Sequence, residues 1–193
     1  MSLSKCLIVL CGPTGVGKTQ IAIELAKYLG CDIISADSRQ LFKEMIIGTA
    51  VPSKEELNAV PHHFVCSHSI HQYYNASMFE QEVLEFLDRY FLENNKIIMA
   101  GGSGLYIDAV CKGIDDLPTI DRNIREQWAA VFNEKGIEFL QQKLYEIDPE
   151  YFDVVDRNNP KRLLKAIEVY EMTGRCYSSF LKNEPKKRPF TIL

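Results

Sequence analysis

Eight consecutive residues near the N-terminus combine the chemical groups that bind phosphate. They are Gly12, Pro13, Thr14, Gly15, Val16, Gly17, Lys18 and Thr19. Glycines let backbone N–H groups point into a loop, and the N-terminus of a following helix adds partial positive charge. Lys18 supplies a mobile cation, and the hydroxyl of Thr19 is a ligand for a phosphate-bound magnesium ion. We therefore predict that this loop binds phosphate groups.

The segments on either side of the loop support this prediction. Residues 6–11 form a short apolar run rich in branched side chains, which is typical of a buried strand. Residues 20–29 place apolar side chains at helical spacing. An ordinary glycine-rich turn is the alternative, but strand, glycine loop and helix is the context in which this pattern holds phosphate.

Two more predicted strands bring further polar residues to the same place. Residues 31–36 form an apolar run that ends at Asp37, Ser38, Arg39 and Gln40. Residues 96–100 form another, which ends in a glycine-rich turn containing Ser103. Because the carboxyl ends of parallel strands meet at one edge of a sheet, we expect Asp37 and Ser103 to lie near the phosphate loop.

The second half of the chain changes character at Gly113. Helical patterns cover roughly 121–135, 137–147 and 159–173, and the next strand candidate begins at residue 190. The sequence thus predicts an α/β protein: a P-loop parallel sheet flanked by helices, with an all-helical insertion. The expected domains are a core over 1–113, the insertion over 114–188, and the start of a returning core strand over 189–193. We also expect that the sequence is cut short at its C-terminal end.

Composition and charge restrict the class of protein. Hydrophobic residues make up 46% of the 193 residues and charged residues 25%, as in soluble globular proteins. No signal peptide or membrane span is recognisable, and the six cysteines contain no CxxC pair. We therefore expect a cytoplasmic monomer with reduced thiols and no membrane partner.

Charge is distributed unevenly along the chain. The net charge is −4, but residues 157–193 carry nine Lys/Arg against three Asp/Glu, a net +6. This basic segment favours an anionic partner such as nucleic acid, although a solvated lysine-rich tail is an equal alternative on charge alone. All four histidines lie between residues 62 and 71, but their spacing fits no standard zinc pattern.

Taken together, these motifs resemble the tRNA dimethylallyltransferases, also called tRNA isopentenyltransferases. The resemblance covers nearly the whole chain. It rests on GPTGVGKT (12–19), DIISADSRQLF (32–42), IGTAVP (47–52), PHH (61–63), GGSGLY (101–106), LP (117–118) and NPKRLLKAIEVYEMTG (159–174). It implies transfer of a dimethylallyl group from dimethylallyl diphosphate to the exocyclic amine of the adenosine just 3′ of the anticodon in tRNA.

The resemblance also assigns roles to individual residues. Residues 12–19 become the diphosphate site, with Lys18 also a catalytic residue and magnesium as the cofactor at Thr19. Asp37 becomes the acceptor of the amine proton, and Ser103, where the family usually has threonine, stands beside it as a catalytic hydroxyl. The implied tRNA contacts are Asp37, Ser38, Arg39, Gln40, Ser103, Arg125, Lys161, Arg162, Leu163, Leu164 and Lys165.

Two other functions remain open at the level of sequence. A P-loop kinase acting on a nucleotide or metabolite would use the same loop, with Asp37 as its base. However, the strand before Gly101 ends without the aspartate that such an enzyme needs for magnesium. A tRNA-binding module without catalysis would leave Asp37 unexplained.

Overall fold

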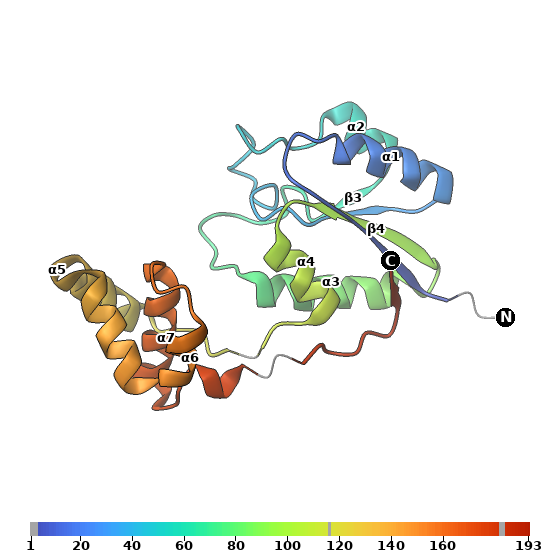
Figure 1. The fold of residues 1–193 in the computed structure, drawn as a ribbon. Coiled ribbons are helices and arrows are strands. Elements are labelled where there is room, and N and C mark those ends of the chain that lie inside the picture. The colour runs from blue at the N-terminus through green and yellow to red at the C-terminus, as the bar shows by residue number, and fades with distance from the viewer. Residues whose placement is uncertain (1–3, 116, 182–183) are drawn as a thin grey trace. The chain divides into compact units, whose positions relative to one another are not determined.

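The computed structural model describes residues 4–115, 117–181 and 184–193, and its described part contains a five-stranded parallel sheet (Figure 1). The strand order is β3-β2-β4-β1-β5. The strands are β1 (Cys6–Cys11), β2 (Ile33–Ser35), β3 (His62–His63), β4 (Lys96–Gly101) and β5 (Thr191–Ile192). The predicted α/β class with a parallel P-loop sheet is confirmed.

Helices cover both faces of this sheet because its central strands are apolar on both sides. On one face α1 (Lys18–Leu29) packs Ala22 and Ala26 against Ile33 and Ile98. The other face is covered by α3 (Ala76–Tyr90) and α4 (Gly104–Lys112) (Figure 1). The short helix α2 (Lys54–Ala59), which begins with a capping box at Ser53, was not predicted from the sequence.

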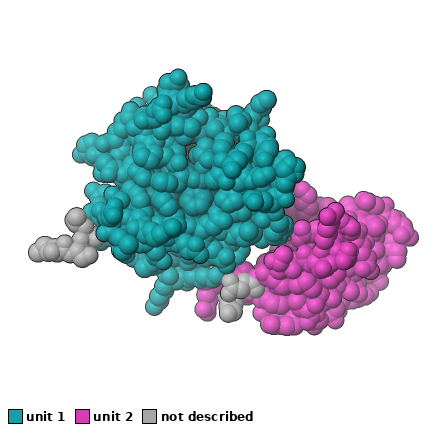
Figure 2. All heavy atoms as spheres, turned by 180° about the vertical axis from the view of Figure 1, so that it is seen from behind, with its two compact units in different colours: residues 1–114, 185–193 teal, residues 115–184 magenta. Residues whose placement is uncertain are grey.

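The chain divides into two compact units, coloured separately in Figure 2. The first comprises residues 1–114 and 185–193, and the second comprises residues 115–184. In the first unit, β5 lies parallel to β1, with Cys6 opposite Thr191. The polypeptide therefore leaves the first unit after Ile114 and returns to it at Pro185.

A buried ion pair connects the departing and returning segments of the first unit. Arg188 donates from Nη2 to Glu80 Oε1 at 2.7 Å, and the two side chains are 7% and 6% exposed. The same guanidinium donates to the carbonyl oxygens of Val110 and Ala109 near the C-terminal end of α4. Glu80 Oε2 in turn accepts from the backbone N–H of Ile114 at 3.2 Å. The Glu80 carboxylate thus binds both the departing segment, at Ile114, and the returning segment, at Arg188.

The described secondary structure of the second unit is helical. It consists of α5 (Arg122–Ile147), α6 (Pro149–Val154), α7 (Pro160–Thr173) and the 3-10 turn η1 (Ser178–Phe180). Gly136 interrupts α5 with φ 78° and ψ −174°, which divides it where the sequence predicted a break between two helices. Asn159 caps α7 and Gly174 ends it, as predicted. Leu140, Leu144 and Leu163 form the centre of this unit's core.

None of the helices in the described residues is both long and apolar enough to span a membrane.

Two of the clustered histidines contact carboxylates. His63 Nε2 lies 2.8 Å from Asp32 Oδ2, and His68 Nε2 lies 3.1 Å from Glu82 Oε2.

Candidate active site

A cavity of about 240 Å³ lies at the carboxyl end of the sheet in the first unit. It combines the phosphate loop with the ends of β2 and β4. The described residues that line it are Thr14, Gly15, Gly17, Lys18, Thr19, Asp37, Gln40, Ala50, Ala100, Gly101 and Gly102. The structure therefore brings the predicted loop, Asp37 and Gln40 together around one space.

The phosphate loop has the backbone geometry that its glycines allow. Gly15 and Gly17 have φ values of 88° and 84°, a region that residues with a Cβ seldom adopt. Gly17 directly precedes α1, whose first residue is Lys18, so the N-terminus of this helix opens at the cavity. Lys18 Nζ donates to Pro13 O at 2.6 Å. The ammonium group of Lys18 is thus held by a carbonyl oxygen of its own loop.

Asp37 is fixed by hydrogen bonds on both sides of it in the chain. The N–H of Ala36 donates to Ala100 O, and the carbonyl of Ala36 accepts from the N–H of Ser103. The N–H of Ser38 donates to Ser103 Oγ at 2.8 Å. The Asp37 carboxylate itself accepts from the N–H of Arg39 at 2.9 Å through Oδ1. Ser103 therefore holds the turn that carries Asp37, although it is not among the described residues that line the cavity.

Gly101 marks the closest approach between β4 and the turn after β2. A Cβ at this position would lie 2.4 Å from the carbonyl carbon of Ala36 and 2.8 Å from its Cα. Real Cβ atoms do not come so close to backbone, so a side chain here would push the Asp37 turn away. Gly102 adjoins the phosphate loop, because a Cβ there would lie 3.4 Å from Gly12 O.

We expect Gly101→Ala to destabilise the protein by about 1–3 kcal/mol, the usual cost of forcing extra atoms into a packed site. Urea unfolding would measure this change. Gly104→Ala is the matched control, because a Cβ at Gly104 would meet nothing within 4 Å. Equal stability of the two variants would contradict the close approach.

Four of the described lining residues were not among the predicted site residues: Ala50, Ala100, Gly101 and Gly102. The last three lie at or just after the end of β4, whereas nothing in the sequence placed Ala50. It belongs to the loop between β2 and α2, where no periodicity indicates a position in space. Its φ of 50° is unusual for a residue other than glycine. Only the motif containing Gly48, Thr49 and Ala50 marked this loop, and it gave no reason to place Ala50 at the phosphate site.

Comparison with known proteins identifies the family to which this chain belongs. The family model described as IPP transferase matches residues 40–193. The chain belongs to the IPP transferase family. Curated relatives include a tRNA dimethylallyltransferase from Flavobacterium psychrophilum, 50% identical over 193 residues, and tRNA dimethylallyltransferase 1 from Bacteroides fragilis, 46% identical over 190 residues. The matches cover 97% and 98% of this chain but 63% of each relative.

One solved structure agrees with this membership, and a second shares the fold. The tRNA isopentenylpyrophosphate transferase from Bacillus halodurans is 31% identical, with a TM-score of 0.55, over 89% of this chain and 57% of that one. A eukaryotic dimethylallyltransferase acting on tRNA, 24% identical, shares the fold with a TM-score of 0.77 over 98% of this chain and 47% of that one. The chain spans less than two thirds of the length of these relatives.

The other residues for which the sequence predicted a contact with tRNA, Arg125 and residues 161–165, lie in the second unit. Lys161 and Arg162 are exposed in the first turn of α7. Arg125 on α5 lies 3.9 Å from the buried carboxylate of Glu168, measured from Nε to Oε2. Burial raises the pKa of Glu168, while the positive charges of Arg125 and Lys165 oppose this shift. Basic side chains from two helices of the unit therefore gather around one buried acid.

The two leucines of this segment have a different position from the basic residues. Leu163 is fully buried in the core of the second unit, and Leu164 packs against the same core. The side chain of Leu163 is thus unavailable to a partner, because helical spacing turns it inward, away from the exposed face that carries Lys161 and Arg162. Its contribution to any interface would be to hold α7 in place.

Proposed function

We propose that this protein transfers a dimethylallyl group from dimethylallyl diphosphate to the exocyclic amine of the adenosine 3′-adjacent to the anticodon of tRNA. The observation that carries the proposal is the cavity in which a phosphate loop faces Asp37. Such a cavity, in a member of the IPP transferase family, suits a reaction with a diphosphate leaving group and an attacking amine. The names of the curated relatives support the same substrates.

The chemistry follows from the groups around the cavity. The amine nitrogen attacks C1 of the dimethylallyl group, forming a C–N bond while the C–O bond to diphosphate breaks. The leaving diphosphate accepts hydrogen bonds from the backbone N–H groups of the loop and forms an ion pair with Lys18. An adenine amine is a poor nucleophile, so its proton needs an acceptor, and the carboxylate of Asp37 takes it. Ser103 keeps Asp37 in position.

Magnesium fits this site as an ion carried by the diphosphate. Of the described residues, no three His, Cys, Asp or Glu form a group that could hold a metal alone. The cavity offers the hydroxyl of Thr19, and magnesium commonly combines one or two protein oxygens with phosphate oxygens and water. Bound there, it would neutralise charge on the leaving diphosphate.

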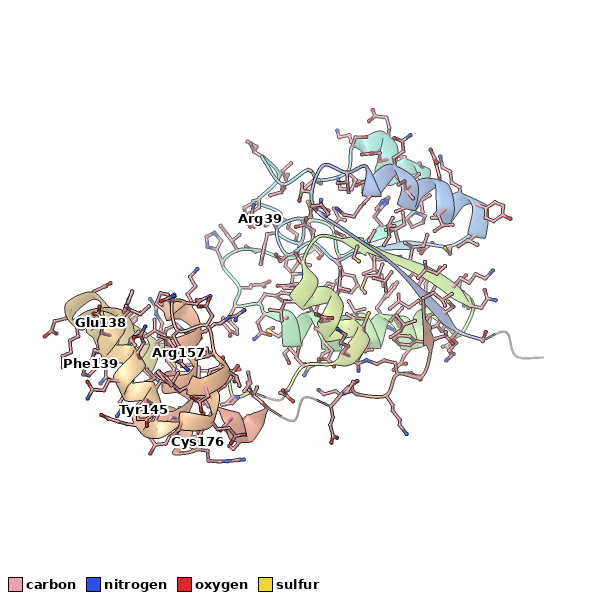
Figure 3. The ribbon with its side chains drawn as sticks, viewed as in Figure 1. Arg39, Glu138, Phe139, Tyr145, Arg157 and Cys176 are labelled. Carbon is pink, nitrogen blue, oxygen red and sulfur yellow. The ribbon has the colours of Figure 1, made fainter. Side chains whose placement is uncertain are left out.

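We further propose that tRNA contacts both units. In the first, the candidates are Ser103 and the turn of residues 37–39, where Arg39 is exposed (Figure 3). In the second, the basic side chains of Arg125, Lys161, Arg162 and Lys165 suit phosphate groups of the RNA backbone. A base in a folded loop must be splayed out before a protein group can reach it, which requires a grip on the surrounding backbone.

A direct experiment compares prenyl transfer with phosphoryl transfer. The protein is incubated with tRNA and dimethylallyl diphosphate, and in parallel with ATP and a panel of nucleosides and nucleotides. We expect mass spectrometry of the digested tRNA to find prenylated adenosine in the first reaction only. Phosphorylated product in the second reaction, without prenylated adenosine in the first, would favour the kinase. Binding of tRNA with neither product would favour a binding module.

Substitutions in the two units should separate the two substrates. Lys18→Ala should weaken dimethylallyl diphosphate binding by about 10-fold or more, because an ion-paired hydrogen bond to the diphosphate is lost. It should leave tRNA affinity nearly unchanged.

The double variant Arg162→Ala/Lys165→Ala should weaken tRNA binding and leave the affinity for dimethylallyl diphosphate nearly unchanged. It should also flatten the salt dependence of tRNA affinity by up to about two released counterions. Calorimetry measures the affinity for dimethylallyl diphosphate, and filter binding at several salt concentrations measures the affinity for tRNA. A double variant that binds tRNA with the parental salt slope would show that these residues form only a solvated face.

A further inference from the structure

The side chain of Gln40 is fully engaged within the protein. Its Oε1 accepts from the hydroxyl of Ser35 at 3.0 Å. Its Nε2 donates to the carbonyl oxygens of Thr49 at 3.1 Å and Ala50 at 2.8 Å. An amide nitrogen has two N–H donors, so both are used by the loop of residues 45–50.

This loop depends on Gln40 because its own conformation is unfavourable. Ala50 has a φ of 50°, a region that a non-glycine residue seldom adopts unless its surroundings hold it there. The hydroxyl of Thr49 donates to the carbonyl oxygens of Met45 and Ile46, which closes the loop on itself. The bonds from Gln40 then attach the closed loop to the end of β2.

The attachment matters for the cavity because Gln40 and Ala50 both line it. The N–H of Gln40 also lies 3.4 Å from Oδ1 of Asp37. One residue therefore connects the turn that carries Asp37 with the loop that forms another part of the cavity wall. A glutamine with these bonds has its N–H donors facing the loop rather than a nucleic acid base.

We propose that Gln40 is a positioning residue that holds the loop of residues 45–50 against the phosphate-loop cavity. It acts on the transfer reaction through this loop and not by reading a base of the tRNA. This inference deepens the proposed function and rests on it for its catalytic part. The claim that Gln40 holds the loop of residues 45–50 does not depend on which reaction the protein catalyses.

The test uses Gln40→Met, which keeps the length of the side chain and removes both donors. Hydrogen–deuterium exchange of the ligand-free protein should show faster uptake in peptides covering residues 45–51, by about 10-fold or more for the loss of two hydrogen bonds. The dissociation constant for pyrophosphate should rise, while that for tRNA stays at the parental value. Gln40→Glu should raise uptake further, because it sets a carboxylate against two carbonyl oxygens.

Two more variants make the outcome decisive. Arg39→Ala, on the exposed neighbouring position, should leave uptake in residues 45–51 unchanged. Ser35→Ala retains Gln40 and removes only its orienting bond, so it should give an intermediate increase even if Gln40→Met fails to fold. Parental uptake and pyrophosphate binding in Gln40→Met, together with weakened tRNA binding, would overturn the proposal in favour of a base contact. Because exchange and pyrophosphate binding need no prenyl transfer, failure of the proposed function would be seen separately.

Discussion

Asp37→Asn should lower the turnover of dimethylallyl transfer by about 100-fold or more, the usual contribution of a positioned general base. Asparagine has the same shape as aspartate, and its side-chain oxygen can still accept from the N–H of Arg39. It cannot take a proton from an adenine amine at neutral pH. Single-turnover assays with saturating tRNA and dimethylallyl diphosphate would measure the loss.

Pyrophosphate binding provides the control for this variant. The phosphate loop and Lys18 are untouched, so affinity for pyrophosphate with magnesium should stay at the parental value or improve slightly as a negative charge leaves the cavity. Asp37→Ala should lose as much turnover as Asp37→Asn while also loosening the turn. Parental turnover in Asp37→Asn would show that another group accepts the proton.

The second large effect concerns stability. Glu80→Leu should destabilise the protein by about 3–5 kcal/mol, because it leaves the buried guanidinium of Arg188 without its carboxylate. It also removes the acceptor for the N–H of Ile114. Chemical unfolding monitored by circular dichroism would measure the change.

A double-mutant cycle separates the ion pair from the packing around it. Glu80→Leu/Arg188→Met buries no uncompensated charge, so it should cost less than the sum of the two single variants. Glu82→Leu, on the same helix but with a side chain that is 39% exposed, is the control and should cost less than Glu80→Leu. Strict additivity in the cycle would mean that Glu80 and Arg188 contribute independently.

The sequence predicted those parts of the fold that depend on local pattern. The apolar runs before Gly12 and Gly101 became β1 and β4, and the Asn159 cap with Gly174 bounded α7, because caps and periodicity are properties of neighbouring residues. The shortest elements were harder to predict from the sequence. Helix α6, which begins at Pro149, was not anticipated.

The candidate site was predictable where it lies at strand ends and unpredictable where it depends on a loop. The phosphate loop, Asp37 and Ser103 follow from the rule that parallel strands end at one edge. Ala50 reaches the cavity through side-chain bonds from Gln40 across ten positions, and no pattern of hydrophobicity records such bonds. For the same reason, the sequence alone could not indicate that the side chain of Gln40 is occupied within the protein.

The strand order has a consequence for how the protein forms during synthesis. Cys6 of β1 pairs with Lys96 of β4 and with Thr191 of β5, which lies 185 positions later in the chain. At typical translation speeds, β1 waits roughly 10–40 s for this second neighbour. The helices of residues 122–173 pack through contacts much closer in sequence, and such contacts form quickly. We therefore expect the nascent chain to carry a folded helical unit while one edge of β1 is still unpaired and open to chaperones.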